Sequence, residues 1–93
     1  MRRAPRVDAN QGTIVAGLRD YGASVESLAG QHRGCPDLLV GFRGRNYLLE
    51  VKDGSKPPSG QKLTEMQAVW HSIWEGQVAV VASLEEALEV LNT

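Results

Sequence analysis

The spacing of apolar residues along the chain switches several times between that of a helix and that of a strand. Helical spacing predicts a first helix over residues 8–21, a second between Thr64 and Gly76, and a third after Ser83. Short apolar runs predict strands over residues 23–28, 37–42, 47–52 and 77–82. The predicted order is αβββαβα, and the class is α/β.

Local signals fix several ends of these elements. Thr64 with Gln67, and Ser83 with Glu86, have the spacing of capping boxes at helix starts. Residues 53–62 are dense in Pro, Gly and Ser, which predicts an exposed linker.

Two acids and one base lie inside the predicted hairpin of residues 37–42 and 47–52, among apolar neighbours. A tight turn centred on Arg43-Gly44 places residues whose numbers add up to 87 opposite each other. Asp37 and Glu50 are such a pair, and opposed residues have Cβ atoms about 4.5–5.5 Å apart. Lys52 lies on the same face as Glu50, because side chains alternate along a strand.

Two carboxylates so close together repel each other unless a cation lies between them. A divalent cation bound by Asp37 and Glu50 would also be a catalytic tool. The alternative is an ion-pair cluster of Asp37, Glu50 and Lys52 on an exposed sheet face, worth at most about 1 kcal/mol per pair.

Length and composition favour one domain over residues 1–93, with residues 1–7 as a flexible basic tail. The apolar runs are too short for a membrane span, and no secretion signal is recognisable. A single cysteine, Cys35, excludes an internal disulfide and favours a reducing compartment, the cytoplasm. We expect it to be a small packed residue rather than a nucleophile.

Charge is distributed unevenly. All ten Lys and Arg lie in residues 1–62, whereas residues 63–93 contain acids and no Lys or Arg. This favours a basic face for a polyanion. Several Lys and Arg side chains in the predicted loops could contact phosphates, or could be ordinary solvated charges. These residues are Arg33, Arg43, Arg45, Lys56 and Lys62.

One block of sequence resembles a known family. The residues are Gly34-Cys35-Pro36-Asp37, followed by Glu50-Val51-Lys52-Asp53-Gly54 and a downstream Gln67. This block, with its helix and strand context, resembles the PD-(D/E)XK nuclease superfamily. It is most similar to the VRR-NUC (virus-type replication-repair nuclease) branch, in particular to small, stand-alone, phage-encoded members.

The resemblance implies a mixed sheet of about four strands flanked by helices, and an endonuclease that hydrolyses DNA with Mg²⁺ or Mn²⁺. It implies that Asp37, Glu50 and the backbone carbonyl of Val51 bind the metal, and that Lys52 orients or activates the attacking water. Gln67 would contact the water shell of the metal or support Lys52. Alternatively, Gln67 is only a helix cap and has neither role.

The resemblance also implies a homodimer that cuts branched DNA such as four-way junctions, in the cytoplasm of a phage's bacterial host. Neither a membrane nor a nucleotide cofactor is expected. Trp70 and Trp74 are expected in the core or a dimer interface, with the last helix as a further dimer surface. His32 could approach the phosphate, whereas His71 is expected to be exposed.

The chain departs from the family in its first helix, where an acidic residue often lies near the metal. Asp8, Asn10 or Gln11 could substitute through water. The departure supports one alternative, a non-catalytic DNA-binding module on a decayed nuclease fold. A further alternative is a regulatory domain whose acidic C-terminal part binds a protein.

Overall fold

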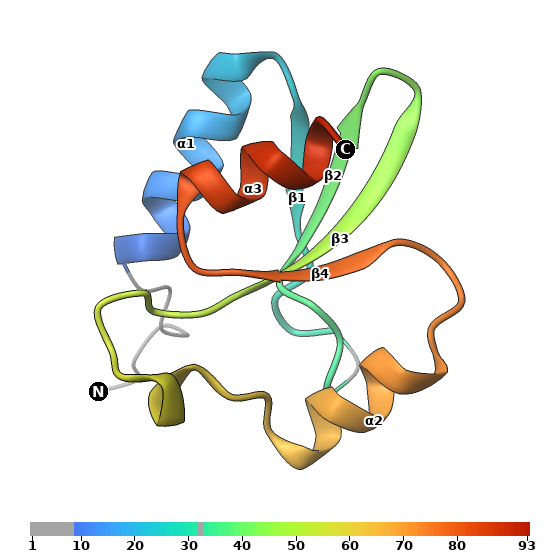
Figure 1. Cartoon of the computed structure of the whole chain (residues 1–93). Coiled ribbons are helices and arrows are strands. Elements are labelled where there is room, and N and C mark those ends of the chain that lie inside the picture. Colours follow the sequence, from blue (N-terminus) through green and yellow to red (C-terminus); the bar gives the residue numbers. More distant parts are fainter. Residues whose placement is uncertain (1–8, 32) are drawn as a thin grey trace, which may run out of the picture.

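The computed structural model describes residues 9–31 and 33–93. The basic tail expected over residues 1–7, the helix start at Asp8 and the expectation for His32 lie outside these residues. The elements follow one another in the predicted order, with a short 3₁₀ helix, η1, added in the linker (Figure 1). Their bounds are α1 Ala9–Tyr21, β1 Ser24–Ser27, β2 Leu38–Phe42, β3 Arg45–Val51, η1 Pro58–Gln61, α2 Glu65–Ile73, β4 Val78–Val81 and α3 Leu84–Leu91.

The four strands form one mixed sheet in the order β1-β2-β3-β4, which confirms the expected architecture. β1 and β3 are antiparallel to β2, and β4 is parallel to β3. Leu38 pairs with Leu49 and Phe42 with Arg45, so the predicted register of the hairpin is confirmed. Arg43 and Gly44 at its turn both have positive φ, 52° and 79°. Two such residues make the tight turn whose twist matches that of the flanking strands.

One face of the sheet is covered by α1 and α3, which also pack against each other. A Cβ on Gly17 of α1 would overlap the side chain of Leu84 in α3, so the absence of a side chain lets these helices approach closely. The buried core lies between these helices and the sheet. It comprises Ile14, Leu18, Ala23, Val25, Leu38, Val40, Tyr47, Leu49, Val51, Val81, Ala87 and Leu91.

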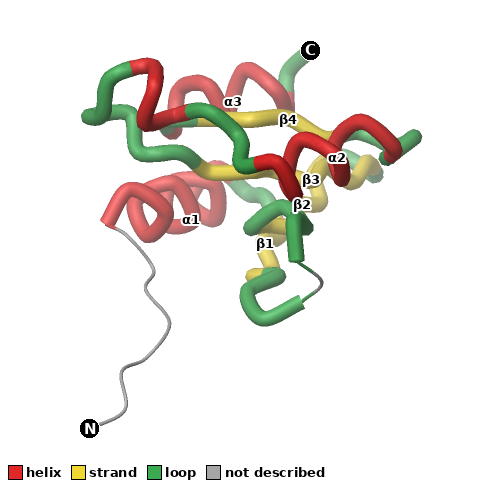
Figure 2. Tube along the Cα trace, turned by 90° about the horizontal axis from the view of Figure 1, so that it is seen from below, coloured by secondary structure: helices red, strands yellow, loops and turns green. Residues whose placement is uncertain are grey.

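The other face of the sheet is covered only in part, by α2. Figure 2 shows η1 and α2 nearest the reader, in a view from below that leaves α1 and α3 behind them. Gly34, with φ of +87°, lets the loop before β2 lie directly on α2, because a Cβ there would come within 2.6 Å of the Met66 carbonyl oxygen. No helix among the described residues is long and apolar enough to cross a membrane.

Several details differ from the expectations. Tyr21 is 46% exposed and packs on Phe42, with ring centroids 5.4 Å apart, rather than in the core. α2 ends at Ile73, before Gly76, because Trp74 is already extended. At Ser83 only half of the capping box forms, since the carboxylate of Glu86 accepts from the amide of Ala82 instead.

Trp74 is 46% exposed, so it is not a core residue. Its ring stacks on that of Trp70, with centroids 4.7 Å apart. The exposed apolar surface of α2 comprises Met66, Val69, Ile73 and Trp74.

Candidate active site

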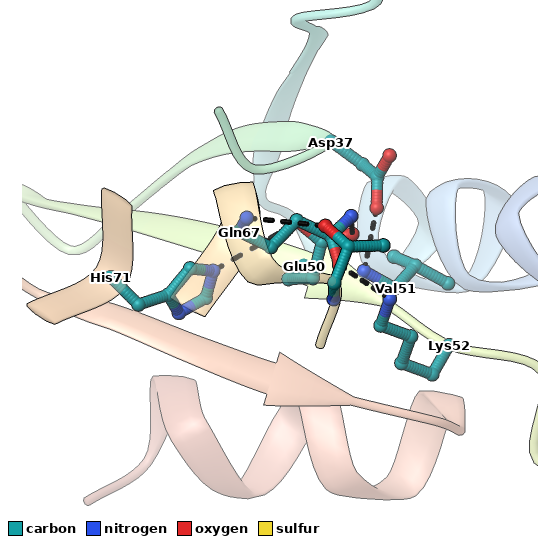
Figure 3. A network of polar contacts seen from close by, with 7 residues as sticks. Asp37, Glu50, Val51, Lys52, Gln67 and His71 are labelled. Atoms are coloured by element: carbon teal, nitrogen blue, oxygen red, sulfur yellow. Dashed lines mark hydrogen bonds and ion pairs between the residues drawn. The ribbon is translucent and has the colours of Figure 1, made fainter. Parts of the chain in front are cut away.

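Charged and polar side chains meet where β2 begins and β3 ends. Asp37 directly precedes β2, Glu50 lies within β3, and Lys52 directly follows β3. From the other side, α2 contributes Gln67 and His71 (Figure 3). The paired ladder of β2 and β3 ends with Leu38 opposite Leu49, so Asp37 and Glu50 are the next residue on each chain segment. The hairpin therefore brings the two acids together, as its numbering predicts.

Glu50 is the centre of this cluster. Its residue surface is only 2% exposed. Oε2 accepts a hydrogen bond of 3.2 Å from Nε2 of Gln67, whereas Oε1 is buried without a partner among the described residues. Burial first, and then the neighbouring Asp37 carboxylate, raise the pKa of Glu50 from 4.5 to about 8, and Lys52 opposes them. At neutral pH this carboxyl therefore requires either a proton or a cation.

Asp37 is held by the backbone of β3. Its Oδ2 accepts a hydrogen bond of 2.7 Å from the amide of Val51 (Figure 3). The amide and carbonyl of one strand residue point to the same edge, so the Val51 carbonyl also points toward β2. Pro36, two residues before the start of β2, has no N–H to donate to it. The Val51 carbonyl is therefore available to a ligand next to Asp37.

Gln67 joins the lysine to the buried acid. Its Oε1 accepts from Nζ of Lys52 at 2.8 Å, while its Nε2 donates to Glu50. The same Oε1 also accepts from the amide of Thr64 at 2.9 Å, and the Gln67 amide donates back to the Thr64 hydroxyl. The predicted capping box is confirmed. The Gln67 side chain both caps the helix and supports Lys52.

The backbone of Lys52 is fixed from two sides. Its amide donates to the carbonyl of Val81 at 2.9 Å, and its carbonyl accepts from Nδ2 of Asn10 at 2.6 Å. Asn10 also donates to Ala82, at 3.1 Å. The first turn of α1 thus contributes an amide that ties the ends of β3 and β4 together. Gln11 lies farther along α1, in a hollow between α1 and β1.

These residues fit a divalent cation. The donors are the carboxylates of Asp37 and Glu50 and the carbonyl of Val51, all oxygens, which Mg²⁺ and Mn²⁺ prefer. No group of three His, Cys, Asp or Glu side chains capable of holding a metal exists within residues 9–31 and 33–93. Water would complete the coordination, as is usual for Mg²⁺. The burial of Glu50 beside a second carboxyl, that of Asp37, is the observation that such a cation explains.

An exposed ion-pair cluster, the alternative to a cation site, does not describe the geometry. Glu50 is buried rather than exposed, and Nζ of Lys52 bonds to Gln67. Cys35 lies close enough for Glu50 and Asp37 to raise the pKa of its thiol, although burial is the larger cause. A raised pKa keeps this thiol protonated, which suits a packed residue and not a nucleophile.

The expectation that His71 is exposed is wrong. Its side chain is 13% exposed, and its Nε2 lies 3.9 Å from Oε1 of Glu50. Burial first, and then Lys52, lower the pKa of His71, so the imidazole is neutral at pH 7. One sequence signal could have located it: His71 is four residues after Gln67, and residues at this spacing share a helix face.

The five candidate DNA-binding cations separate into two groups. Arg33, Lys56 and Lys62 lie in the loops next to β2 and β3 at the end that carries Asp37 and Glu50. Arg43 and Arg45 lie at the turn, at the other end of the hairpin. Glu50 is five positions after Arg45 on β3, a distance of about 17 Å along the strand.

Comparisons with known proteins bear on the fold. No protein-family model matches the chain, and no curated protein matches it. A solved structure titled "VRR_NUC domain" is similar, with a TM-score of 0.62 and 27% sequence identity. The match covers 88% of this chain and 89% of that chain. The four-stranded mixed sheet and its flanking helices are therefore those of a VRR_NUC-like fold.

Proposed function

We propose that this chain, whose fold is that of a VRR_NUC domain, is a nuclease of the VRR-NUC family that hydrolyses phosphodiester bonds within DNA with the aid of Mg²⁺ or Mn²⁺. One observation carries the metal-dependent part of this proposal. Glu50 is buried, and the carboxyl of Asp37 lies beside it. A buried carboxylate next to a second one is costly, and a bound cation removes that cost.

Three groups would hold the cation: the carboxylates of Asp37 and Glu50 and the carbonyl of Val51. When bound, a divalent cation supplies Lewis-acid polarisation of the phosphate and lowers the pKa of a water molecule. Asp37 already has one oxygen fixed by the Val51 amide, so its orientation is set before any ligand arrives.

Lys52 is proposed to orient the attacking water and to stabilise negative charge on the phosphate. Its ammonium group is held in place by Gln67 and retains two further N–H donors for water or phosphate. Gln67 acts on the reaction through Lys52 and Glu50, both of which it contacts.

The two groups of Lys and Arg side chains suggest how DNA lies on the protein. Arg33, Lys56 and Lys62 would contact phosphates next to the scissile bond, whereas Arg43 and Arg45 lie about 17 Å away, which corresponds to about five base pairs of B-DNA. We propose that a second duplex arm reaches them, which makes branched DNA such as a four-way junction the preferred substrate. Phosphate contacts of this kind carry no base specificity.

We further propose that the protein acts as a homodimer. Two symmetric sites would cut two strands of a junction. The exposed apolar surface of α2 is a candidate interface, because its four residues Met66, Val69, Ile73 and Trp74 are each 46% exposed or more. α3 is a second candidate. The proposed compartment is the cytoplasm, in a phage's bacterial host, in keeping with the single Cys35 thiol.

Cleavage assays test the function directly. Labelled linear, flap and four-way DNA are incubated with the protein in Mg²⁺, Mn²⁺ or EDTA, alongside Asp37→Asn and a matched surface control, Glu26→Gln. We expect cutting by the wild type and by Glu26→Gln with either cation, and none in EDTA or with Asp37→Asn. Cutting in EDTA would refute the metal-dependent proposal.

A second candidate function is a non-catalytic DNA-binding module. The favouring observation is that the described first turn of α1, from Ala9 on, presents the Asn10 amide and contains no acid. Salt-dependent DNA binding without cleavage in any cation would establish this alternative.

A further inference from the structure

Two buried polar atoms face each other without a partner on the side of the site formed by α2. Oε1 of Glu50 and Nε2 of His71 are both buried, and neither has a hydrogen-bond partner among the described residues. They lie 3.9 Å apart, which is too far for a hydrogen bond. Leaving a buried donor or acceptor unpaired is unfavourable, so a polar contact between these two atoms is expected.

His71 is not placed as a metal ligand together with Asp37 and Glu50. No group of three acidic, His or Cys side chains within residues 9–31 and 33–93 lies close enough to bind a metal. In Figure 3, the imidazole approaches Glu50 from the α2 side, and Asp37 lies on the other side of the carboxylate. His71 therefore acts on the site through Glu50.

We propose that His71 is a positioning residue, whose Nε2–H donates to Oε1 of Glu50 while Gln67 holds Oε2. α2 would then fix both oxygens of the carboxylate through residues one helical turn apart. Each oxygen retains a lone pair, so the carboxylate still binds a cation in a set orientation. The inference rests on the proposed metal-dependent function and adds a residue to it.

The role depends on the tautomer of the imidazole. A neutral imidazole carries one N–H, on either Nε2 or Nδ1. When a bound cation keeps Glu50 ionised, its carboxylate accepts but cannot donate, so the proton must be on Nε2 for the pair to bond. A movement of about 1 Å by either side chain brings the two atoms to an ordinary hydrogen-bond length.

Two variants distinguish the contribution of the His71 N–H donor from that of its ring. His71→Phe keeps a flat ring against Trp70, whose centroid lies 6.0 Å from that of His71, but removes the N–H. His71→Gln removes the ring but keeps an N–H donor at a similar distance from the backbone. Isothermal titration with Mn²⁺ measures the affinity of each folded variant, and single-turnover cleavage measures its rate.

We expect His71→Phe to bind Mn²⁺ about 10–100-fold more weakly than the wild type, and His71→Gln to recover most of the affinity. Unchanged affinity in His71→Phe would overturn the proposal. Equal losses in both variants would also overturn it, because they would show that the ring matters and not the donor.

The wild type provides a test that depends on no variant. Nitrogen-15 NMR of the imidazole, recorded with saturating Mg²⁺ so that Glu50 is ionised, distinguishes the two neutral tautomers, and we expect the Nε2–H form. An Nδ1–H form would overturn the proposal. Absence of Mn²⁺ binding by the wild type would instead refute the proposed function itself, so the two failures are distinguishable.

Discussion

Replacing Glu50 with glutamine tests whether a buried, unpartnered carboxyl lies at the centre of the site. The substitution keeps the shape of the side chain, and the new amide oxygen can still accept from Gln67. It removes the charge from a residue that is 2% exposed and whose Oε1 has no partner in the described part of the chain. The metal-free protein should therefore become more stable, while the cation site is lost.

The size of the effect follows from the raised pKa of Glu50, about 8 against an ordinary 4.5. Below pH 4.5 the carboxyl is protonated in both the folded and the unfolded chain, and it costs no stability. Between pH 4.5 and 8 only the unfolded chain releases the proton, so the metal-free wild type loses stability as the pH rises. Each pH unit corresponds to about 1.4 kcal/mol, which gives about 3 kcal/mol at pH 7 and below about 1 kcal/mol at pH 5.

Urea unfolding in EDTA at pH 5, 7 and 8 measures this difference, with Glu26→Gln as the control for loss of one exposed acid. We expect Glu50→Gln to exceed the wild type in free energy of unfolding by an amount that grows with pH. Adding Mn²⁺ at about 100 times its Kd should stabilise the wild type by about 2.7 kcal/mol and leave Glu50→Gln unchanged. A difference that does not vary with pH, or equal stabilisation by Mn²⁺, would refute the reasoning.

Three further predictions concern Lys52, Gln67 and the two lysines of the linker. Lys52→Met should lower the single-turnover cleavage rate by about 10²–10⁴-fold while Mn²⁺ binding measured by titration persists; a rate near that of the wild type would exclude Lys52 from catalysis. Gln67→Ala should lose cleavage and about 1 kcal/mol of stability, whereas Thr64→Ala should lose only the stability, because it removes the cap but not the contacts to Lys52 and Glu50. Replacing Lys56 and Lys62 together with alanine should weaken DNA binding and reduce the slope of log affinity against log salt by about 2; an unchanged slope would show that neither contacts phosphate.

Local sequence signals determined much of the fold. The Arg43-Gly44 turn between two apolar runs predicted the register of the hairpin, and a slip of one residue would move every side chain to the other face. That register brings Asp37 next to Glu50, one position beyond the paired Leu38 and Leu49. The sequence also predicted the capping box at Thr64, because both of its partners lie within one helical turn.

Only the tertiary structure decided how α2 lies on the sheet. Gln67 and His71 are 17 and 21 positions from Glu50 in the chain, and no local pattern relates them to it. The docking of α2 depends on the packing of its loops, including Gly34 against the Met66 carbonyl. That packing buries Glu50 and gives Gln67 its second role. It also turns His71 inward and leaves the apolar surface of α2 exposed, because one side of a short helix can cover the sheet while the other faces outward.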